Sequence, residues 1–484
     1  MAIARKIAYN IVFNSFLKVL TTVALSLLSI RLITGYLGKE GFGDYTTILA
    51  FFAFFSAIAD LGISAVTVRE ISREGSDEED ILSRVVSLRI FSSLALFLLV
   101  PVILFFFAYP FSVKLGIWIT SGAVIFSSFS LFLNGIFQKN IAMDRVAMVE
   151  FFGKLAQVGA VFAVVSFDLG FLAIVSTLVI SLIFNATLAF VLSRKYVRFA
   201  FIVDVAYWKK FLHESLPLGG SALITFFYFK LDAILLSILQ GSAAVGIYGV
   251  AYKVMENLTF FPAMLAGLIL PLLARSVFTD KEKFRDIADT TFRVFLIVVV
   301  PIIIGGIFFS SDIISIVSGS GFEESVVVLE LLLLSLGFIF FGHYFNMMLI
   351  VGNLQKKLMK TLLFVAILNI SMNLFLIPKY SYLGAAIASV LTEFSVVTLT
   401  GFLVYKFLDY KPSFGKIWRV FLAGLSMAAF LYEFHGALPF IVAGFLSVLV
   451  YLFALWAVRA VTSQEITELF SKKPTVFVPQ EEIV

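Results

Sequence analysis

A long succession of apolar runs decides what this chain can fold into. The runs follow one another along nearly the whole sequence, separated by charge clusters or by glycine and proline turns. Each holds about 20 or more mostly apolar residues, enough for a helix to cross the roughly 30 Å hydrocarbon core of a bilayer. About fourteen runs are present by this criterion, near residues 7–36, 43–68, 85–108, 114–138, 146–167, 170–193, 211–239, 244–275, 288–309, 325–351, 358–377, 383–406, 416–434 and 438–460.

The composition excludes a soluble globular protein. Hydrophobic residues make up 61% of the 484 and charged residues 14%, with a mean hydropathy of +1.05, whereas a soluble domain carries about 25% charged residues. The chain has no cysteine, and His213, His343 and His435 lie far apart. We therefore expect an all-α polytopic membrane protein that is not an enzyme, with no catalytic residues, no metal site and no cofactor.

The distribution of positive charge predicts the topology. The net charge of +5 is interpreted as a topology signal rather than as a nucleic-acid surface. Assigning alternate loops to the two sides places most of the 36 lysines and arginines on the side of the amino terminus, so both termini are expected in the cytoplasm and the chain in the cytoplasmic (inner) membrane. The exceptions are Lys39, Lys114 and Lys379 on the opposite side, and Lys18, Arg31, Lys230 and Lys253 within predicted helices.

An internal repeat divides the chain. The stretch "GKEGFGDY" (Gly38 to Tyr45) aligns with "GSAAVGIY" (Gly241 to Tyr248), and in each half it follows the first helix. We interpret the glycines as a tight outer turn and the tyrosines, Tyr45 and Tyr248, as anchors at the membrane interface. A second pair of similar segments supports the repeat: "LGFLAIVSTL" (Leu169 to Leu178) and "LGAAIASVL" (Leu383 to Leu391).

The repeat predicts two six-helix lobes that enter the membrane from the same side. Parallel repeats of this kind build transporters that alternate access to a central site. Two further helices follow the second lobe. The expected division is an amino-terminal lobe (1–194), a cytoplasmic linker (195–210), a carboxy-terminal lobe (211–408), helices thirteen and fourteen (409–461) and a cytoplasmic, partly disordered tail (462–484).

Three segments carry a family resemblance. "IRLITGYLGKEGFGDYTTILAF" (Ile30 to Phe51), "KLDAILLSILQGSAAVGIYGVAYKV" (Lys230 to Val254) and "NLFLIPKYSYLGAAIASVLTE" (Asn373 to Glu393) resemble hallmark segments of Wzx-like flippases. These form the polysaccharide transporter branch of the multidrug, oligosaccharidyl-lipid and polysaccharide flippase superfamily. The resemblance implies a flippase that moves a polyprenyl-diphosphate-linked oligosaccharide from the inner to the outer leaflet. It implies a monomer surrounded by membrane lipids, with glycan-biosynthesis proteins as potential partners and no nucleic acid.

Cations within the predicted helices are the candidates for contacting the substrate diphosphate. Lys18 and Arg31 lie on the first helix, and Lys230 and Lys253 on the seventh and eighth. Such charges are expensive in lipid and usually face a cavity, although snorkelling towards the headgroups is the alternative for Lys18 and Arg31. The spacing of four between Asn10, Asn14 and Lys18 places a polar stripe on one face of the first helix.

Four carboxylates within the helices have structural or coupling interpretations. Asp60 is expected to pair with a cation such as Lys18 or to cap its helix, and Glu256 to pair with Lys253 three residues before it. Asp232 and Glu393 are candidates for coupling to H⁺ or Na⁺. The alternative for these two is interhelical hydrogen bonding to Asn369 or Asn373.

Lys230 and Asp232 cannot pair with each other if they lie on one helix. Residues two apart point about 200° from each other. We therefore expect one to face the cavity and the other to bind a neighbouring helix, with Lys230 as the anion contact.

Three other functions are weighed against the oligosaccharide flippase. A MATE-like antiporter of drugs and cations would favour acidic residues in its cavity. A MurJ-like flippase for lipid II would share the basic cavity. A polyprenyl-linked glycosyltransferase or polymerase belongs to a different class and needs a sizeable soluble loop with carboxylates or metal ligands. The acidic loop that carries Asp77 to Asp80 is short and has no histidine nearby, which disfavours this class.

Overall fold

The computed structural model describes residues 24–413, 415 and 417–460. Within these ranges the chain is helical and has no strand. The helices are α2 (Ser26–Asp60), α3 (Ile63–Ile71), α4 (Glu78–Phe105), α5 (Phe111–Lys139), α6 (Met143–Ser166), α7 (Phe171–Ser193), α8 (Val205–Leu239), α9 (Ser242–Leu258), α10 (Phe260–Ser276), α11 (Lys281–Phe308), α12 (Ser310–Ser318), α13 (Ser325–Val351), α14 (Gln355–Leu408), α15 (Ile417–Phe434) and α16 (Phe440–Ala457).

Eleven helices of the described part are long and apolar enough to cross a membrane. The chain is therefore a multi-pass membrane protein, although the predicted count of fourteen spans is not confirmed. Two of the eleven contain a non-helical residue where two helices meet, Gly38 in α2 and Ser381 in α14. The predicted span 43–68 ends earlier, because Leu61 and Gly62 have left-handed backbone angles between α2 and α3. The predicted tail (462–484) lies outside the described residues.

Aspartates begin three of the helices. Asp77, Asp204 and Asp280 each accept a hydrogen bond of 3.0 Å from the backbone N–H three residues later. An N-cap carboxylate of this kind satisfies a backbone donor that the helix itself leaves free. The loops that the charge pattern assigns to the cytoplasm therefore also fix where α4, α8 and α11 start.

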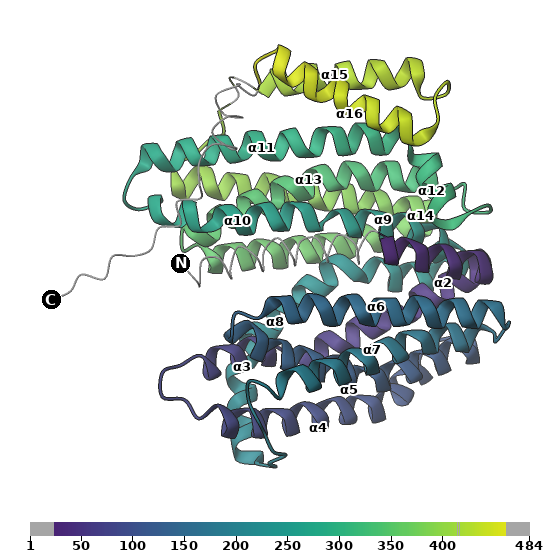
Figure 1. Ribbon diagram of the computed structural model, residues 1–484, viewed down its shortest axis with the longest axis vertical. Helices are drawn as coiled ribbons and strands as arrows, with labels where there is room; N and C mark the ends of the chain where they lie inside the picture. The colour runs from purple at the N-terminus through teal and green to yellow at the C-terminus, as the bar shows by residue number, and fades with distance from the viewer. Residues whose placement is uncertain (1–23, 414, 416, 461–484) are drawn as a thin grey trace.

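The helices gather into two groups that follow the order of the sequence. In Figure 1, α2 to α7 form one group in purple and blue, and α9 to α16 form the other in green and yellow. The described helices of the first group contact the second through α2, which packs on α9 and α12. We call these the amino-terminal and carboxy-terminal groups.

Helix α8 belongs to both groups. It begins at Val205, within the predicted linker (195–210). Near its start, Trp208 donates to the carbonyl of Arg84 in α4 at 3.1 Å. At its other end, Gln240 donates to the carbonyl of Ile377 in α14 at 3.2 Å. The helix therefore connects the two groups along its whole length.

The two repeated glycine turns have the same backbone conformation. Gly38 has φ 65° and ψ −171°, and Gly241 has φ 83° and ψ −178°. Both angles lie in the region that glycine tolerates and other residues avoid. The predicted turn is confirmed, but the predicted interfacial tyrosines are wrong, because Tyr45 and Tyr248 are buried. The Tyr248 hydroxyl binds Asp232 of α8 and lies 3.3 Å from the Ser389 hydroxyl of α14.

The contact between the helices that follow the two turns is reciprocal. A Cβ atom on Gly43 of α2 would lie 1.7 Å from the carbonyl oxygen of Ser242, and one on Gly246 of α9 would lie 2.2 Å from the carbonyl oxygen of Lys39. Glycine is therefore needed at both positions for this approach of the backbones. The Ser242 hydroxyl also donates to Asp44.

Further contacts reinforce the same end of the group interface. Lys39 Nζ lies 2.8 Å from Glu324 Oε1 and 2.9 Å from Oε2, next to the start of α13. The Tyr109 and Ser237 hydroxyls, on the α4–α5 loop and on α8, lie 2.6 Å apart. The two groups are thus closed against each other at the end that carries the glycine turns.

Candidate functional site

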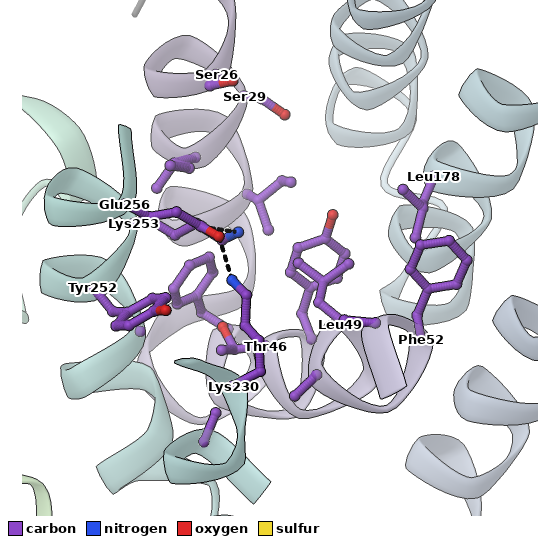
Figure 2. A pocket seen from close by; sticks show the side chains of 18 of the residues that line it. Ser26, Ser29, Thr46, Leu49, Phe52, Leu178, Lys230, Tyr252, Lys253 and Glu256 are labelled. Atoms are coloured by element: carbon purple, nitrogen blue, oxygen red, sulfur yellow. Dashed lines mark hydrogen bonds and ion pairs between the residues drawn. The ribbon is translucent and has the colours of Figure 1, made fainter. Parts of the chain in front are cut away.

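A cavity of about 400 Å³ lies between the two groups (Figure 2). Helix α2 supplies much of its wall, including Ser26, Ser29 and Thr46, and α6, α7, α8 and α9 supply the rest. The two helices that carry the glycine turns therefore also line the cavity. Its charged lining residues are Lys154, Lys230, Asp232, Lys253 and Glu256.

Two of the predicted lysines converge on one carboxylate. Lys230 reaches up from α8 to Glu256 on α9, and Lys253 Nζ lies 2.8 Å from the other Glu256 oxygen (Figure 2). The predicted pairing of Lys253 with Glu256 is confirmed, with Lys230 as a second partner. The ammonium of Lys230 also lies 4.8 Å from the centre of the Tyr252 ring. One carboxylate thus holds two cations in place at the cavity wall.

Lys154 is a cavity cation that sequence reasoning missed. The charge count assigned it to a cytoplasmic loop, but α6 carries it about 16 Å from its first residue at 1.5 Å per residue. Its ammonium donates to Gln157 at 3.0 Å, and both side chains line the cavity. The spacing of Glu150, Lys154 and Gln157 by four and three was the available signal, because it places three polar residues on one helix face.

Asp232 and Lys230 have different polar partners, as expected, but both line the main cavity. One carboxylate oxygen accepts from Asn373 of α14 at 2.8 Å, and the other from Tyr248 of α9 and Ser389 of α14, each at 3.1 Å. The side chain is buried. The predicted interhelical hydrogen bond to Asn373 is confirmed, and Asp232 fastens α8 to α9 and α14.

A second, much smaller cavity adjoins Asp232. Its volume is about 20 Å³, close to the space that one water molecule or small ion needs. The lining includes two carboxylates, Asp232 and the buried Glu393, together with oxygen-bearing side chains from α14. These oxygen-bearing side chains are Asn369, Ser389 and Thr392.

The remaining predicted site residues lie elsewhere. Arg31 does not line the cavity. Its guanidinium lies against Gly319, where an added Cβ atom would be 1.7 Å from Arg31 Nη1. Asp60 pairs with the buried Arg89 at 2.9 Å, inside the amino-terminal group. The structural pairing predicted for Asp60 is therefore made with Arg89 in the part of the chain that the structure describes. Asn10, Asn14 and Lys18 lie outside the described residues.

No group of three or more metal-ligating side chains (His, Cys, Asp or Glu) occurs within the described ranges. The main cavity brings together three lysines from three different helices, with Asp232 and Glu256 also in its lining. The arrangement defines a class: a polytopic helical membrane protein with a central, lysine-lined cavity between two helix groups, as transporters built from repeats have.

Residues 7–277, more than half of the chain, match the family described as polysaccharide biosynthesis protein, and the chain belongs to this family. A curated relative from Haloferax volcanii, described as a probable low-salt glycan biosynthesis flippase (Agl15), is 22% identical over 85% of this chain and 86% of its own. The family and this relative are in line with the predicted Wzx-like branch.

Solved structures share the fold. A lipid II flippase MurJ in an inward closed conformation superposes with a TM-score of 0.76 and 17% identity, covering 92% of this chain and 98% of that one. An inward-facing MATE multidrug transporter gives 0.64 and 12%, covering 83% and 99%. Both alternatives weighed from the sequence therefore have the same architecture, and the fold alone does not choose between them.

Proposed function

We propose that this chain is a flippase that moves a polyprenyl-diphosphate-linked oligosaccharide across the cytoplasmic membrane. One observation carries the proposal: Lys154, Lys230 and Lys253 meet in one cavity between the two groups. The polysaccharide biosynthesis family and the glycan flippase relative support the same substrate class. The description of this relative as a flippase also favours transport over catalysis.

The substrate combines a polar glycan, an anionic diphosphate and an apolar tail. Ammonium groups bind phosphate oxygens through charge-assisted hydrogen bonds. Glu256 pairs with both Lys230 and Lys253. A diphosphate would take over part of this pairing, so the lysines exchange one anionic partner for another and are never left unpaired in the membrane.

Alternating access follows from the closure at one end. With both termini in the cytoplasm, the glycine turns and the Lys39–Glu324 pair lie on the outer side. The present arrangement is then closed to the outside, and release of the glycan requires Gly43 and Gly246 to part. Transport consists of rocking the two groups about the cavity.

The proposal is tested in proteoliposomes with a fluorescent polyprenyl-diphosphate oligosaccharide. Lys230→Gln and Lys253→Gln each remove one cavity cation, and we expect at least tenfold slower flipping with unchanged thermal unfolding. Lys281→Gln is the matched control, because Lys281 is exposed at the start of α11. Unchanged flipping in both cavity variants, or uptake of a cationic dye in place of the glycan lipid, contradicts the proposal.

We further propose that Asp232 and the 20 Å³ cavity couple transport to H⁺ or Na⁺. Asp232→Asn keeps the shape and removes the charge that either ion needs. Flipping by the parent chain is expected to respond to a sodium or a proton gradient, and the response to that gradient is expected to vanish in Asp232→Asn. A chain that responds to neither gradient contradicts coupling at this site.

A further inference from the structure

A third cavity, of about 400 Å³, lies away from the substrate cavity, where α7 ends and the connection to α8 begins. Phe190, Arg194, Val197, Arg198 and Phe199 line it. Helix α7 is one of the membrane-spanning helices, so the cavity lies where the chain leaves the membrane. We call it the linker pocket.

The walls of the linker pocket are fixed by aromatic packing. The rings of Phe190 and Phe199 lie 6.2 Å apart, and Phe199 packs edge-on against Phe132 of α5 at 5.3 Å. The Arg194 guanidinium carbon lies 4.7 Å from the centre of the Phe190 ring, which holds this side chain at the pocket. The pocket is therefore a built feature of the amino-terminal group.

The two arginines of the pocket are available to an anion. In the part of the chain that the structure describes, the neighbouring ion pairs use other cations: Arg84 pairs with Asp80 and Asp204, and Lys139 pairs with Glu78. Guanidinium groups bind the oxygens of a phosphate with two parallel hydrogen bonds. Two arginines beside an apolar floor suit a phosphate that is attached to an apolar body.

The segment after the pocket presents apolar side chains outward. Phe201, Val203 and Val205 are 54%, 53% and 68% exposed. The backbone between them is fastened to α4, because Ala200 donates to the Ser83 hydroxyl at 2.8 Å and Ile202 donates to the Ser83 carbonyl at 3.1 Å. Apolar side chains that a pinned segment exposes at a membrane boundary are suited to contact with acyl chains.

We infer that the linker pocket binds the headgroup phosphate of an anionic phospholipid of the inner leaflet, whose acyl chains lie over Phe201, Val203 and Val205. The leaflet rests on the orientation proposed above, in which this end of α7 is cytoplasmic, where anionic lipids attract basic segments. The bound lipid holds the linker, and with it the start of α8, at the membrane surface. The transported substrate plays no part in this site.

Native mass spectrometry of the detergent-purified full chain tests the inference, with phosphatidylglycerol and phosphatidylcholine as the probes. We expect one phosphatidylglycerol to be retained at least tenfold more strongly than phosphatidylcholine. The double variant Arg194→Gln/Arg198→Gln is expected to lose this preference, and Arg194→Lys/Arg198→Lys to keep part of it. Lys209→Gln/Lys210→Gln is the control, because it removes equal charge from exposed positions at the start of α8.

Three results would overturn the inference. The first is equal retention by the glutamine variant at the arginines and by the parent chain. The second is an equal loss in the lysine control, which would indicate general attraction to a basic surface. The third is displacement of the lipid by millimolar inorganic phosphate, which would indicate a site for soluble phosphate. Thermal unfolding without added lipid shows whether the variants fold, and the readout does not depend on flipping.

Discussion

Gly43 and Gly246 face each other across the two helix groups, and each leaves room for a backbone carbonyl near the other. Because the two positions correspond in the internal repeat, one kind of contact is made twice. The closed end of the protein therefore includes two close backbone approaches that the absence of side chains at Gly43 and Gly246 permits.

A methyl group at Gly43 is expected to open this end. In Gly43→Ala the added Cβ would lie 1.7 Å from the Ser242 oxygen, a separation that the backbones must relieve by moving apart. We expect the outer side to become accessible to a membrane-impermeant thiol reagent at a cysteine introduced at Thr46, a cavity residue in a chain without native cysteines. Gly35→Ala, which meets nothing within 4 Å, is the control. Equal accessibility in the two variants would show that the glycine contact does not close the outer side.

Lys154→Gln is expected to weaken binding of the diphosphate-linked oligosaccharide about tenfold, or ~1.4 kcal/mol. The physical reason is the loss of one charge-assisted contact from α6, opposite the lysines of α8 and α9. Titration of the purified protein with the fluorescent substrate measures it, and Lys154→Arg should retain most of the affinity. An affinity equal to that of the parent chain would assign Lys154 a packing role through Gln157.

Arg89→Ala is expected to lower the free energy of unfolding by about 3–5 kcal/mol, because it leaves Asp60 without its buried cation. Arg89 is 1% exposed and also binds Ser64 at 2.7 Å and Ser128 at 3.0 Å. Thermal unfolding followed by fluorescence measures the loss. Arg73→Ala is the control, since its pair with Glu70 is exposed and such pairs contribute about 0–1 kcal/mol. Similar melting of the two variants would refute this role of the network.

Acidic pH is expected to loosen the closed end. The hydrogen bond from Lys39 holds the pKa of Glu324 below its ordinary value of 4.5. The pair therefore stabilises closure fully above pH 4.5, and this contribution disappears as the pH falls through the lowered pKa. Spin labels on Lys114→Cys and Lys379→Cys should report a wider distance distribution at pH 3.5 than at pH 7.

The matched variant Glu324→Gln removes the titrating group from the same labelled chain. Its distance distribution should be independent of pH over this range. If the two chains respond alike, another group controls the closed end. The expected effect is modest, because the lysine and glutamate side chains are 29% and 44% exposed and surface pairs contribute about 0–1 kcal/mol.

The sequence predicted the architecture because lipid imposes it: apolar runs long enough to cross a bilayer must be helices. It also predicted Lys230 and Lys253 at the cavity, since charges in the middle of such runs need a polar environment, and it predicted the pairing of Lys253 with Glu256. Lys154 and Arg89 were both assigned to cytoplasmic loops. Each lies about eleven residues into its helix, at most half-way along it, and there the sequence does not distinguish a side chain that reaches water from one that turns inward.

The tyrosines of the repeat show a different limit. Tyr45 and Tyr248 follow the glycine turns at positions typical of membrane-interface anchors, yet both are buried. The Tyr248 hydroxyl binds Asp232 of α8 and lies 3.3 Å from the Ser389 hydroxyl of α14, which is 141 residues away along the chain. A hydropathy pattern describes one helix against lipid and carries no information about its partner helix.

The sharing of α8 between the two groups means that the repeat in the sequence is not the division along which the protein moves. A chain cut at the linker would yield a carboxy-terminal fragment whose first helix carries the Trp208 and Glu214 contacts of the other fragment. The two fragments would stay in contact through this helix even if the contact at Gly43 and Gly246 were lost. If the two groups rock as proposed, α8 is expected to flex along its own length, near Pro217 in its interior. One helix would then serve as both the tether and the hinge of the molecule.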